Sequence, residues 1–97
     1  MEVLNKPKLI HLASGETFKL FFIEGNTGMK MPPHHSTQDA IIVIQKGEAL
    51  LQMPHEDHFL KRGDSFIIPA KKEHSLTIKK DLKAIAVMAV ESEIIFI

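Results

Sequence analysis

Histidine is the residue type with the widest chemical use in this sequence, because the chain has six histidines and no cysteine. Without cysteine there is neither a disulfide framework nor a thiolate metal site, so a metal would need imidazole or oxygen ligands. His74 opens an alternating stretch, and Leu76 and Ile78 fall on the same face. A histidine that shares a face with leucine and isoleucine points into a core or a cavity. His74 is therefore the first candidate for a functional side chain.

A second candidate cluster follows the two prolines at 32–33. By the two-residue period of a strand, alternate residues from position 34 share one face, provided that no bulge intervenes. Imidazole, hydroxyl and amide groups on one face can bind a small polar or anionic molecule by hydrogen bonds, and imidazoles can also hold a metal ion. The residues that share this face are His34, Ser36, Gln38 and Ala40.

The other histidines carry weaker signals. His55 and His58 flank Glu56-Asp57, which is the composition of a histidine and carboxylate metal cluster, but a polar segment after Pro54 is more typical of a solvated hairpin turn. We favour the turn. His11 fits a structural or surface role. No serine lies where a histidine is oriented for nucleophilic catalysis, so the sequence argues against a serine hydrolase.

Short apolar segments rich in β-branched and aromatic residues alternate with turn signals about every 8–12 residues, which predicts an all-β sandwich or barrel in one domain, 1–97. Segment 82–90 also contains helix-favouring residues, and we interpret it as a strand. The prolines at 32–33 force an extended backbone that cannot pair in a central ladder. The expected strands are 9–13, 17–23, 40–44, 48–53, 58–60, 65–68, 74–78, 82–90 and 93–97, with turns at 46–47, 54–57 and 79–81.

Charge and hydropathy exclude several classes of partner. The chain has 12 basic and 12 acidic side chains without a long run of either sign, which argues against nucleic-acid binding. No apolar run approaches the length of a membrane span and no signal pattern begins the chain, so we expect a soluble, cytoplasmic protein without a membrane partner. Segment 40–44 is apolar on both faces and segment 94–97 is apolar throughout. Both patterns favour a homodimer.

Two glycine-bounded motifs in the chain resemble those of the cupin family, and specifically the small single-domain, RmlC-like cupins. The match runs over about residues 17–90. In the first motif the family has a glycine, two histidines, a glutamate and a glycine, at positions held here by Gly28, His34, Ser36, Ala40 and Gly47. In the second it has a glycine, a proline, a glycine, a histidine and an asparagine, at positions held here by Gly63, Pro69, Lys71, His74 and Ile78.

The resemblance implies a double-stranded β-helix, or jelly-roll, barrel with His34 and His74 directed inward. The family's metal site uses three histidines and a carboxylate, and Ser36 and Ala40 stand here in place of one histidine and the carboxylate. The resemblance therefore implies a degenerate metal site, with either no cofactor or a weakly bound divalent metal (Zn, Ni, Mn or Fe) at His34 and His74. The expected ligand-binding residues are His34, Ser36, Gln38 and His74.

Three interpretations stay open at this point. In the favoured one, the barrel binds a small polar molecule without catalysis. In the alternative, the protein is a metal-dependent enzyme of the dioxygenase or isomerase type that uses His34 and His74 with unusual partners, among them His35 if the prolines shift the register by one residue. In the third, both histidines are buried structural residues bonded to Ser36, Gln38, a carbonyl or water. A structural role of this kind, together with the apolar segments 40–44 and 94–97, would suit a dimeric sensor or accessory barrel.

Overall fold

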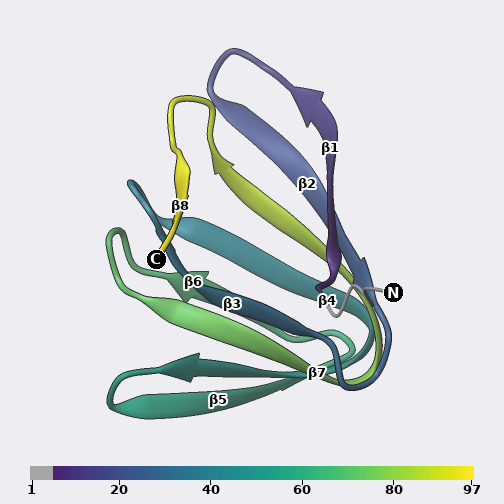
Figure 1. The fold of residues 1–97 in the computed structure, drawn as a ribbon. Coiled ribbons are helices and arrows are strands. Elements are labelled where there is room, and N and C mark those ends of the chain that lie inside the picture. The colour runs from purple at the N-terminus through teal and green to yellow at the C-terminus, as the bar shows by residue number, and fades with distance from the viewer. Residues whose placement is uncertain (1–5) are drawn as a thin grey trace, which may run out of the picture.

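The computed structural model describes residues 6–97, and these residues form eight strands and no helix (Figure 1). Consequently, no helix in this part of the chain is long and apolar enough to cross a membrane. Each expected strand segment overlaps a strand, although residues 17, 90, 93 and 97 lie just outside, and the ambiguous segment 82–90 falls almost entirely in the longest strand. The sequence does not predict the strand over 30–36, because its two prolines argue against pairing. The strands are β1 (Lys8–Ser14), β2 (Phe18–Gly25), β3 (Lys30–Ser36), β4 (Ala40–Met53), β5 (Glu56–Lys61), β6 (Ser65–Ile68), β7 (His74–Ala89) and β8 (Ile94–Phe96).

The two longest strands, β4 and β7, replace four shorter ones that the sequence predicts. The turns expected at 46–47 and 79–81 are wrong, because both segments are bends inside continuous strands. β4 and β7 pair side by side along their lengths, with register irregularities between Ile44 and Ala49. Gly47 has a φ of 86°, and a Cβ there would lie 2.0 Å from the carbonyl oxygen of Asp81. A glycine at this position therefore lets the two chains bend together in close contact.

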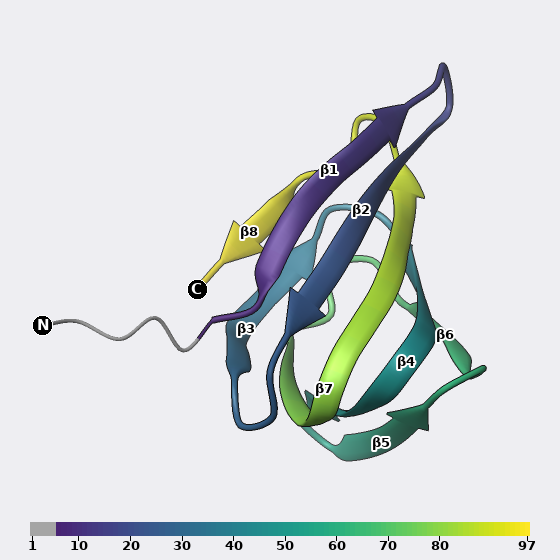
Figure 2. The ribbon, with the colours of Figure 1, turned by 90° about the vertical axis from the view of Figure 1, so that its right-hand side faces the viewer.

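These bends divide one antiparallel sheet into two halves that curl toward each other (Figures 1 and 2). In the β2 half, the strand order is β1, β2, the second part of β7, the first part of β4, and β6. In the β3 half, the order is β8, β3, the first part of β7, the second part of β4, and β5. The terminal strands β1 and β8 are therefore edge strands of opposite halves.

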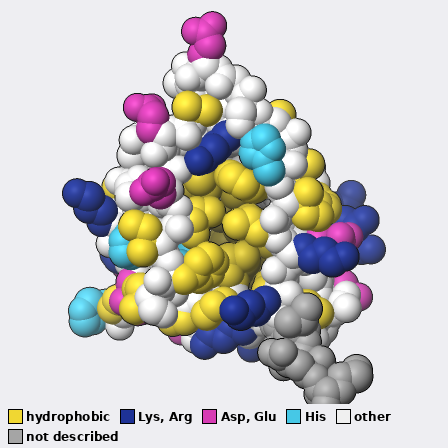
Figure 3. All heavy atoms as spheres, turned by 45° about the horizontal axis from the view of Figure 1, so that its top comes forward, with side chains coloured by type: hydrophobic (Ala, Val, Ile, Leu, Met, Phe, Trp, Pro, Cys, Tyr) yellow, Lys and Arg dark blue, Asp and Glu magenta, His cyan; other side chains and the backbone are white. Residues whose placement is uncertain are grey.

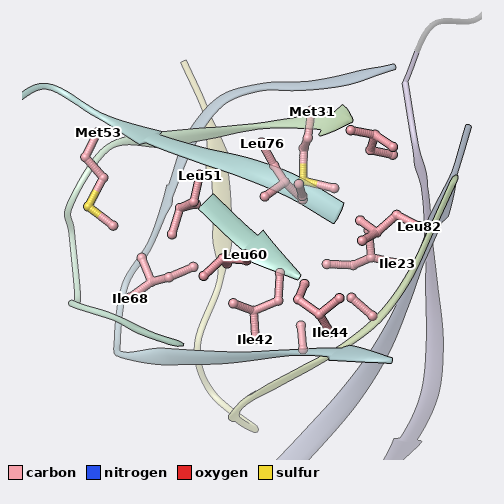
Figure 4. Close-up of a cluster of buried hydrophobic side chains, with 14 residues drawn as sticks. Ile23, Met31, Ile42, Ile44, Leu51, Met53, Leu60, Ile68, Leu76 and Leu82 are labelled. Atoms are coloured by element: carbon pink, nitrogen blue, oxygen red, sulfur yellow. The ribbon is translucent and has the colours of Figure 1, made fainter. Parts of the chain in front are cut away.

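The core lies between the two halves (Figure 4). Residues of the β2 half, such as Ile23 and Ile42, and residues of the β3 half, such as Leu51 and Leu76, belong to one buried cluster. They alternate along their strands with exposed or half-buried residues, as a sheet with one covered face requires. The apolar C-terminal segment, expected to pair within the sheet or with a second copy, pairs as β8 with β3.

The segment between β3 and β4 is tied to the turn between β7 and β8. Ser92 is fully buried there, and its hydroxyl oxygen accepts a hydrogen bond of 3.3 Å from the backbone N–H of Gln38. The hydroxyl of Thr37 accepts a 3.0 Å bond from the N–H of Glu93. These bonds end β3 at Ser36 and hold the following loop against the end of the barrel.

Candidate functional site

A bulge at Pro32–Pro33 decides which histidine of β3 faces the interior. Met31 pairs with Leu76 and His34 pairs with His74, so the two prolines lie opposite a single residue of β7. Because proline has no N–H to donate, this is the position where the ladder can be interrupted at least cost. Met31 and His34 are both buried although they are three residues apart. The bulge thus turns the strand over and directs His34 inward.

His35 lies on the opposite face of β3 and is half-buried. It is absent from the residues that line the interior cavity. The sequence left open that a register shift at the prolines would bring His35 inward as a third metal ligand. The register does shift there, but it is His34 that faces the interior. His35 therefore cannot serve as that third ligand in this register.

His74 is positioned by the loop that precedes β7. The backbone N–H of Lys71 donates a 2.7 Å hydrogen bond to the carbonyl oxygen of Ser36, which ties this loop to the end of β3. Lys71 has a φ of 65°, a left-handed conformation that glycine adopts more readily than lysine. The cupin motif has glycine at this position, so the loop keeps the backbone geometry although the residue differs.

The rings of His34 and His74 pack edge to face, with centroids 4.2 Å apart and planes inclined at 62°. Both histidines make the same bond to the carbonyl two residues earlier: Nδ1 of His34 donates to the oxygen of Pro32 at 2.7 Å, and Nδ1 of His74 to that of Lys72 at 2.9 Å. A carbonyl oxygen can only accept, so Nδ1 carries the proton in both rings. In the neutral rings, both Nε2 atoms therefore carry a lone pair.

Burial keeps both rings neutral. It lowers the pKa of His74 from 6.5 to about 4, against the opposing effect of the hydrogen bond to Lys72, and a proton on His34 or His35 would lower it further by repulsion. Burial also lowers the pKa of His34, again against a backbone hydrogen bond, with a smaller lowering from His35. The site therefore offers two hydrogen-bond acceptors and no positive charge at neutral pH.

A cavity of about 40 Å³ lies against the two rings, enough room for about three water molecules. Figure 3 shows a hollow in the surface whose visible lining is mostly hydrophobic. Leu9 of β1 and Ile94 of β8 contribute to its wall from the two edge strands. The lining residues are Leu9, Ile23, Met31, His34, Ser36, Ala40, Ile41, Ile42, Leu51, Ile68, His74, Leu76, Ala86, Met88 and Ile94.

Ser36 and Gln38 are placed differently. Ser36 is 4% exposed and lines the cavity beside the two histidines. Gln38 is exposed and is absent from the cavity lining, so the face shared with His34 does not extend to it. The two-residue period applies only within a strand, and β3 ends at Ser36. Gln38 lies instead in the loop that Ser92 holds.

The remaining histidines lie outside this site. His58 donates a 2.6 Å hydrogen bond to Glu56, and its ring packs on Phe66 at 4.4 Å. Both His58 and Glu56 belong to β5, so the polar turn is shorter than the expected 54–57 and is reduced to Pro54 and His55. His11 contacts Ser14 at 2.7 Å on the exposed strand β1.

The C-terminal strand contributes two site residues that no motif in the sequence indicates. Phe96 pairs with His34, and their ring centroids are 5.1 Å apart. Ile94 pairs with Ser36 and lines the cavity. The only signal for them was that residues 94–97 are apolar throughout, and this does not reveal which strand a segment will join.

The donor set does not complete a metal site. His34 and His74 have the Nε2 lone pairs and the carbonyl-bound Nδ1 groups that metal-ligating histidines have. However, Ser36 and Ala40 line the same cavity at the positions of the missing histidine and carboxylate. Within residues 6–97, no three histidine, cysteine, aspartate or glutamate side chains are grouped to hold a metal ion. Two imidazoles alone fall short of the three protein ligands of a typical catalytic zinc site.

Several solved structures share this fold. A cupin superfamily protein from Desulfitobacterium hafniense matches with a TM-score of 0.80 and 19% identity, over 94% of this chain and 84% of that one. An RmlC-like cupin from Methanocaldococcus jannaschii, described as a double-stranded β-helix, matches with a TM-score of 0.77 and 24% identity, over 88% and 81%. The DMSP lyase DddQ from Ruegeria pomeroyi gives 0.84 and 18%, over 94% of this chain and 51% of the lyase.

These likenesses confirm the expected fold, an all-β double-stranded β-helix. No sequence among the curated proteins matches the chain. The cupin domain model matches residues 19–90, which include both glycine-bounded motifs and both inward-facing histidines. The chain therefore belongs to the cupin family.

Proposed function

We propose that this protein binds a small polar molecule in its barrel, with His34, His74 and Ser36 as the contacting residues. The observation that carries the proposal is the pair of carbonyl-held imidazoles, whose rings line a cavity of about 40 Å³ and keep Nε2 out of the bonds to the backbone carbonyls. Burying a polar group without a hydrogen-bond partner costs free energy, and a few polar side chains in an otherwise apolar cavity are typical of a ligand site. A purely structural role would not need two neutral acceptors at the same cavity.

A metal-dependent cupin enzyme, such as a dioxygenase or an isomerase, has less support. The two histidines are held as metal ligands are, but Ser36 and Ala40 supply neither an imidazole nor a carboxylate. A metal titration followed by thermal unfolding separates the two functions, since a metal bound to the folded state raises the melting temperature. A large rise that the substitution His74→Ala abolishes would favour the enzyme.

Fragment binding, followed by NMR, tests the proposal directly. We expect small polar fragments to shift the ring signals of His34 and His74 saturably, and the substitution His34→Gln to weaken that binding about tenfold or more. His35→Gln, one residue away on the opposite face, is the matched control and should leave binding unchanged. Elemental analysis that finds one equivalent of a transition metal per chain would reject the proposal. Fragments that leave the signals of both His34 and His74 unchanged would reject it as well.

We further propose that the protein is a homodimer that pairs through the outer face of the β2 half. Across its central strands, Leu20, Val87, Ile41 and Ile67 form one row, and Phe22, Ile85 and Val43 form the next. Ile67 is 61% exposed and Ile41 37% exposed. The five strands of this half have between four and eight residues each, so together they cover about 500 Å². Two such faces bury about 1,000 Å² in total, which is the size that a specific interface must reach.

A further inference from the structure

The polar side chains of the cavity all lie on one wall, beside apolar ones, and the opposite wall is entirely apolar. The three polar side chains, His34, Ser36 and His74, all come from the β3 half. The β2 half contributes apolar residues such as Ile42, Ala86 and Met88. Among the described residues, no lysine, arginine, aspartate or glutamate lines the cavity. A bound molecule would therefore contact polar groups on one side and hydrocarbon on the other.

The polar wall offers acceptors rather than donors. Both histidines use Nδ1–H on the carbonyls of Pro32 and Lys72, which leaves Nε2 as the atom of each ring available to a ligand. None of the side-chain hydrogen bonds found among residues 6–97 uses either Nε2 atom. With ring centroids 4.2 Å apart, one small head group can reach both rings. Only the Ser36 hydroxyl can both donate and accept.

This set of two acceptors and one hydroxyl disfavours charged ligands. A carboxylate or phosphate carries acceptors only, so it would face two acceptors unless a ring were protonated. Burial opposes that protonation by lowering the pKa of both histidines. A cationic ligand would find no carboxylate in the cavity to offset the loss of its hydration.

We propose that the natural ligand is uncharged, with a hydroxyl or primary amide head that donates to Nε2 of His34 and His74, and a compact apolar body along the wall of Ile42 and Met88. This inference rests on the proposed binding function and specifies its ligand class. A primary amide matches the wall fully, because its two N–H groups can reach the two rings while its oxygen accepts from Ser36. A cavity of about 40 Å³ holds such a head, and the body extends toward the opening.

Isobutyramide and isobutyrate test the inference, because they have nearly the same shape and differ in donors and charge. The chain has no Trp or Tyr, so binding is best followed by NMR, through the imidazole and isoleucine methyl signals of the full-length protein at pH 8. We expect isobutyramide to bind at least about tenfold more tightly than isobutyrate. The substitution His34→Phe, which removes an acceptor without adding a donor, should abolish this preference, and His35→Phe should not.

The outcomes separate the inference from the function on which it rests. Isobutyrate binding as tightly as the amide, or more tightly, would overturn the inference and leave the binding function in place. The absence of any shift with either probe would also overturn the inference. If, in addition, no fragment perturbed His34 and His74, the proposed binding function itself would fail.

Discussion

His34 and His74 face each other across the β3–β7 pair, with ring centroids 4.2 Å apart and each Nδ1 bonded to the carbonyl two residues earlier. The same local bond fixes the same tautomer in two rings that come from different strands. Since both rings are buried, a proton on one would stand beside the other without a counter-charge. The arrangement is therefore stable only while both rings are neutral.

We expect the stability of the protein to fall as the pH is lowered from 6.5 toward 4. The folded-state pKa of His74 is about 4, whereas its ordinary value is 6.5. In this window the unfolded chain binds a proton that the folded chain does not, so the free energy of unfolding decreases with falling pH. After allowance for solvent screening, the loss between pH 7 and pH 5 is about 1–2 kcal/mol. Urea unfolding at the two pH values measures it.

An NMR titration of the imidazole signals gives a second measure of the same effect. His74 should titrate near pH 4 and His34 below its ordinary value. Hydrogen bonds from His58 and Thr27 lower the carboxyl pKa values of Glu56 and Asp81. These two groups therefore lose their stabilising effect below about pH 5, outside the range in which the two stabilities are compared. Equal stability at pH 7 and pH 5, with both rings titrating near 6.5, would contradict the buried neutral pair.

Much of this site could be predicted from the sequence. The alternation after position 74 was sufficient to place His74 on the interior face, because β7 is regular there. His34 was harder, since its direction depends on a bulge. The two prolines signalled the interruption in the ladder, and the family resemblance, rather than the alternation, indicated which histidine would face inward.

Features that depend on contacts between distant segments could not be predicted. Gly47 looked like a hairpin turn, because a Lys-Gly pair is typical of one, but its neighbour across the sheet is Asp81 rather than a nearby residue. The strand period, extended past Ser36, predicts Gln38 on the interior face, but Gln38 is exposed and does not line the cavity. The backbone N–H of Gln38 bonds to Ser92, 54 residues away in the chain, and this bond ends the strand period. A contact between such distant residues cannot be read from the local sequence pattern.

The substitution Gly47→Ala should destabilise the protein by at least about 3 kcal/mol. A Cβ at this position would lie 2.0 Å from the carbonyl oxygen of Asp81, and the φ of 86° adds strain for any residue but glycine. Gly63→Ala is the matched control, because Gly63 has a φ of 90° but no atom within 4 Å of the added Cβ. That variant should lose only about 1 kcal/mol. Equal losses in urea unfolding would show that the close contact with Asp81 is unimportant.

The substitution Lys71→Gly should stabilise the protein by about 0.5–1 kcal/mol. Lys71 is exposed, so its side chain contributes little packing, and glycine relieves the strain of a φ of 65°. Relieving the strain stabilises the folded state, whereas the greater flexibility of glycine stabilises the unfolded chain. The net gain in the free energy of unfolding is the difference between these two effects. Glu73→Gly, in the same loop but at an ordinary φ, should instead be neutral or destabilising. A loss of stability in Lys71→Gly would contradict the conformational explanation.

Restoring the two missing ligands should create a metal site. Ser36 and Ala40 line the cavity with His34 and His74, so the double substitution Ser36→His and Ala40→Glu would complete three imidazoles and a carboxylate. With Ni²⁺ or Zn²⁺ at about 100 times the dissociation constant, the bound ion adds about 2.7 kcal/mol, which raises Tm by about 10 °C or more. The wild-type protein should show a much smaller rise.

The pair Ser36→His and Ala40→Gln is the control for this design, since glutamine has nearly the shape of glutamate but no charge. It should gain less than the carboxylate variant, because the metal's charge is then uncompensated. Thermal unfolding without metal checks that each variant folds. If the carboxylate variant folds but neither ion raises its Tm, the two histidines cannot converge on one metal.

The outer face of the β2 half should hold two copies of the chain together. Sedimentation at micromolar concentration should give twice the 10.9 kDa mass of the chain. Ile67→Lys places a charge in the exposed row that would face the second copy, so this variant should sediment as a monomer with nearly unchanged stability of its fold. Phe59→Lys is the matched control, because Phe59 is 53% exposed on β5 of the β3 half. A wild-type monomer would reject the dimer, and a dimer lost in Phe59→Lys but kept in Ile67→Lys would move the interface to the β3 half.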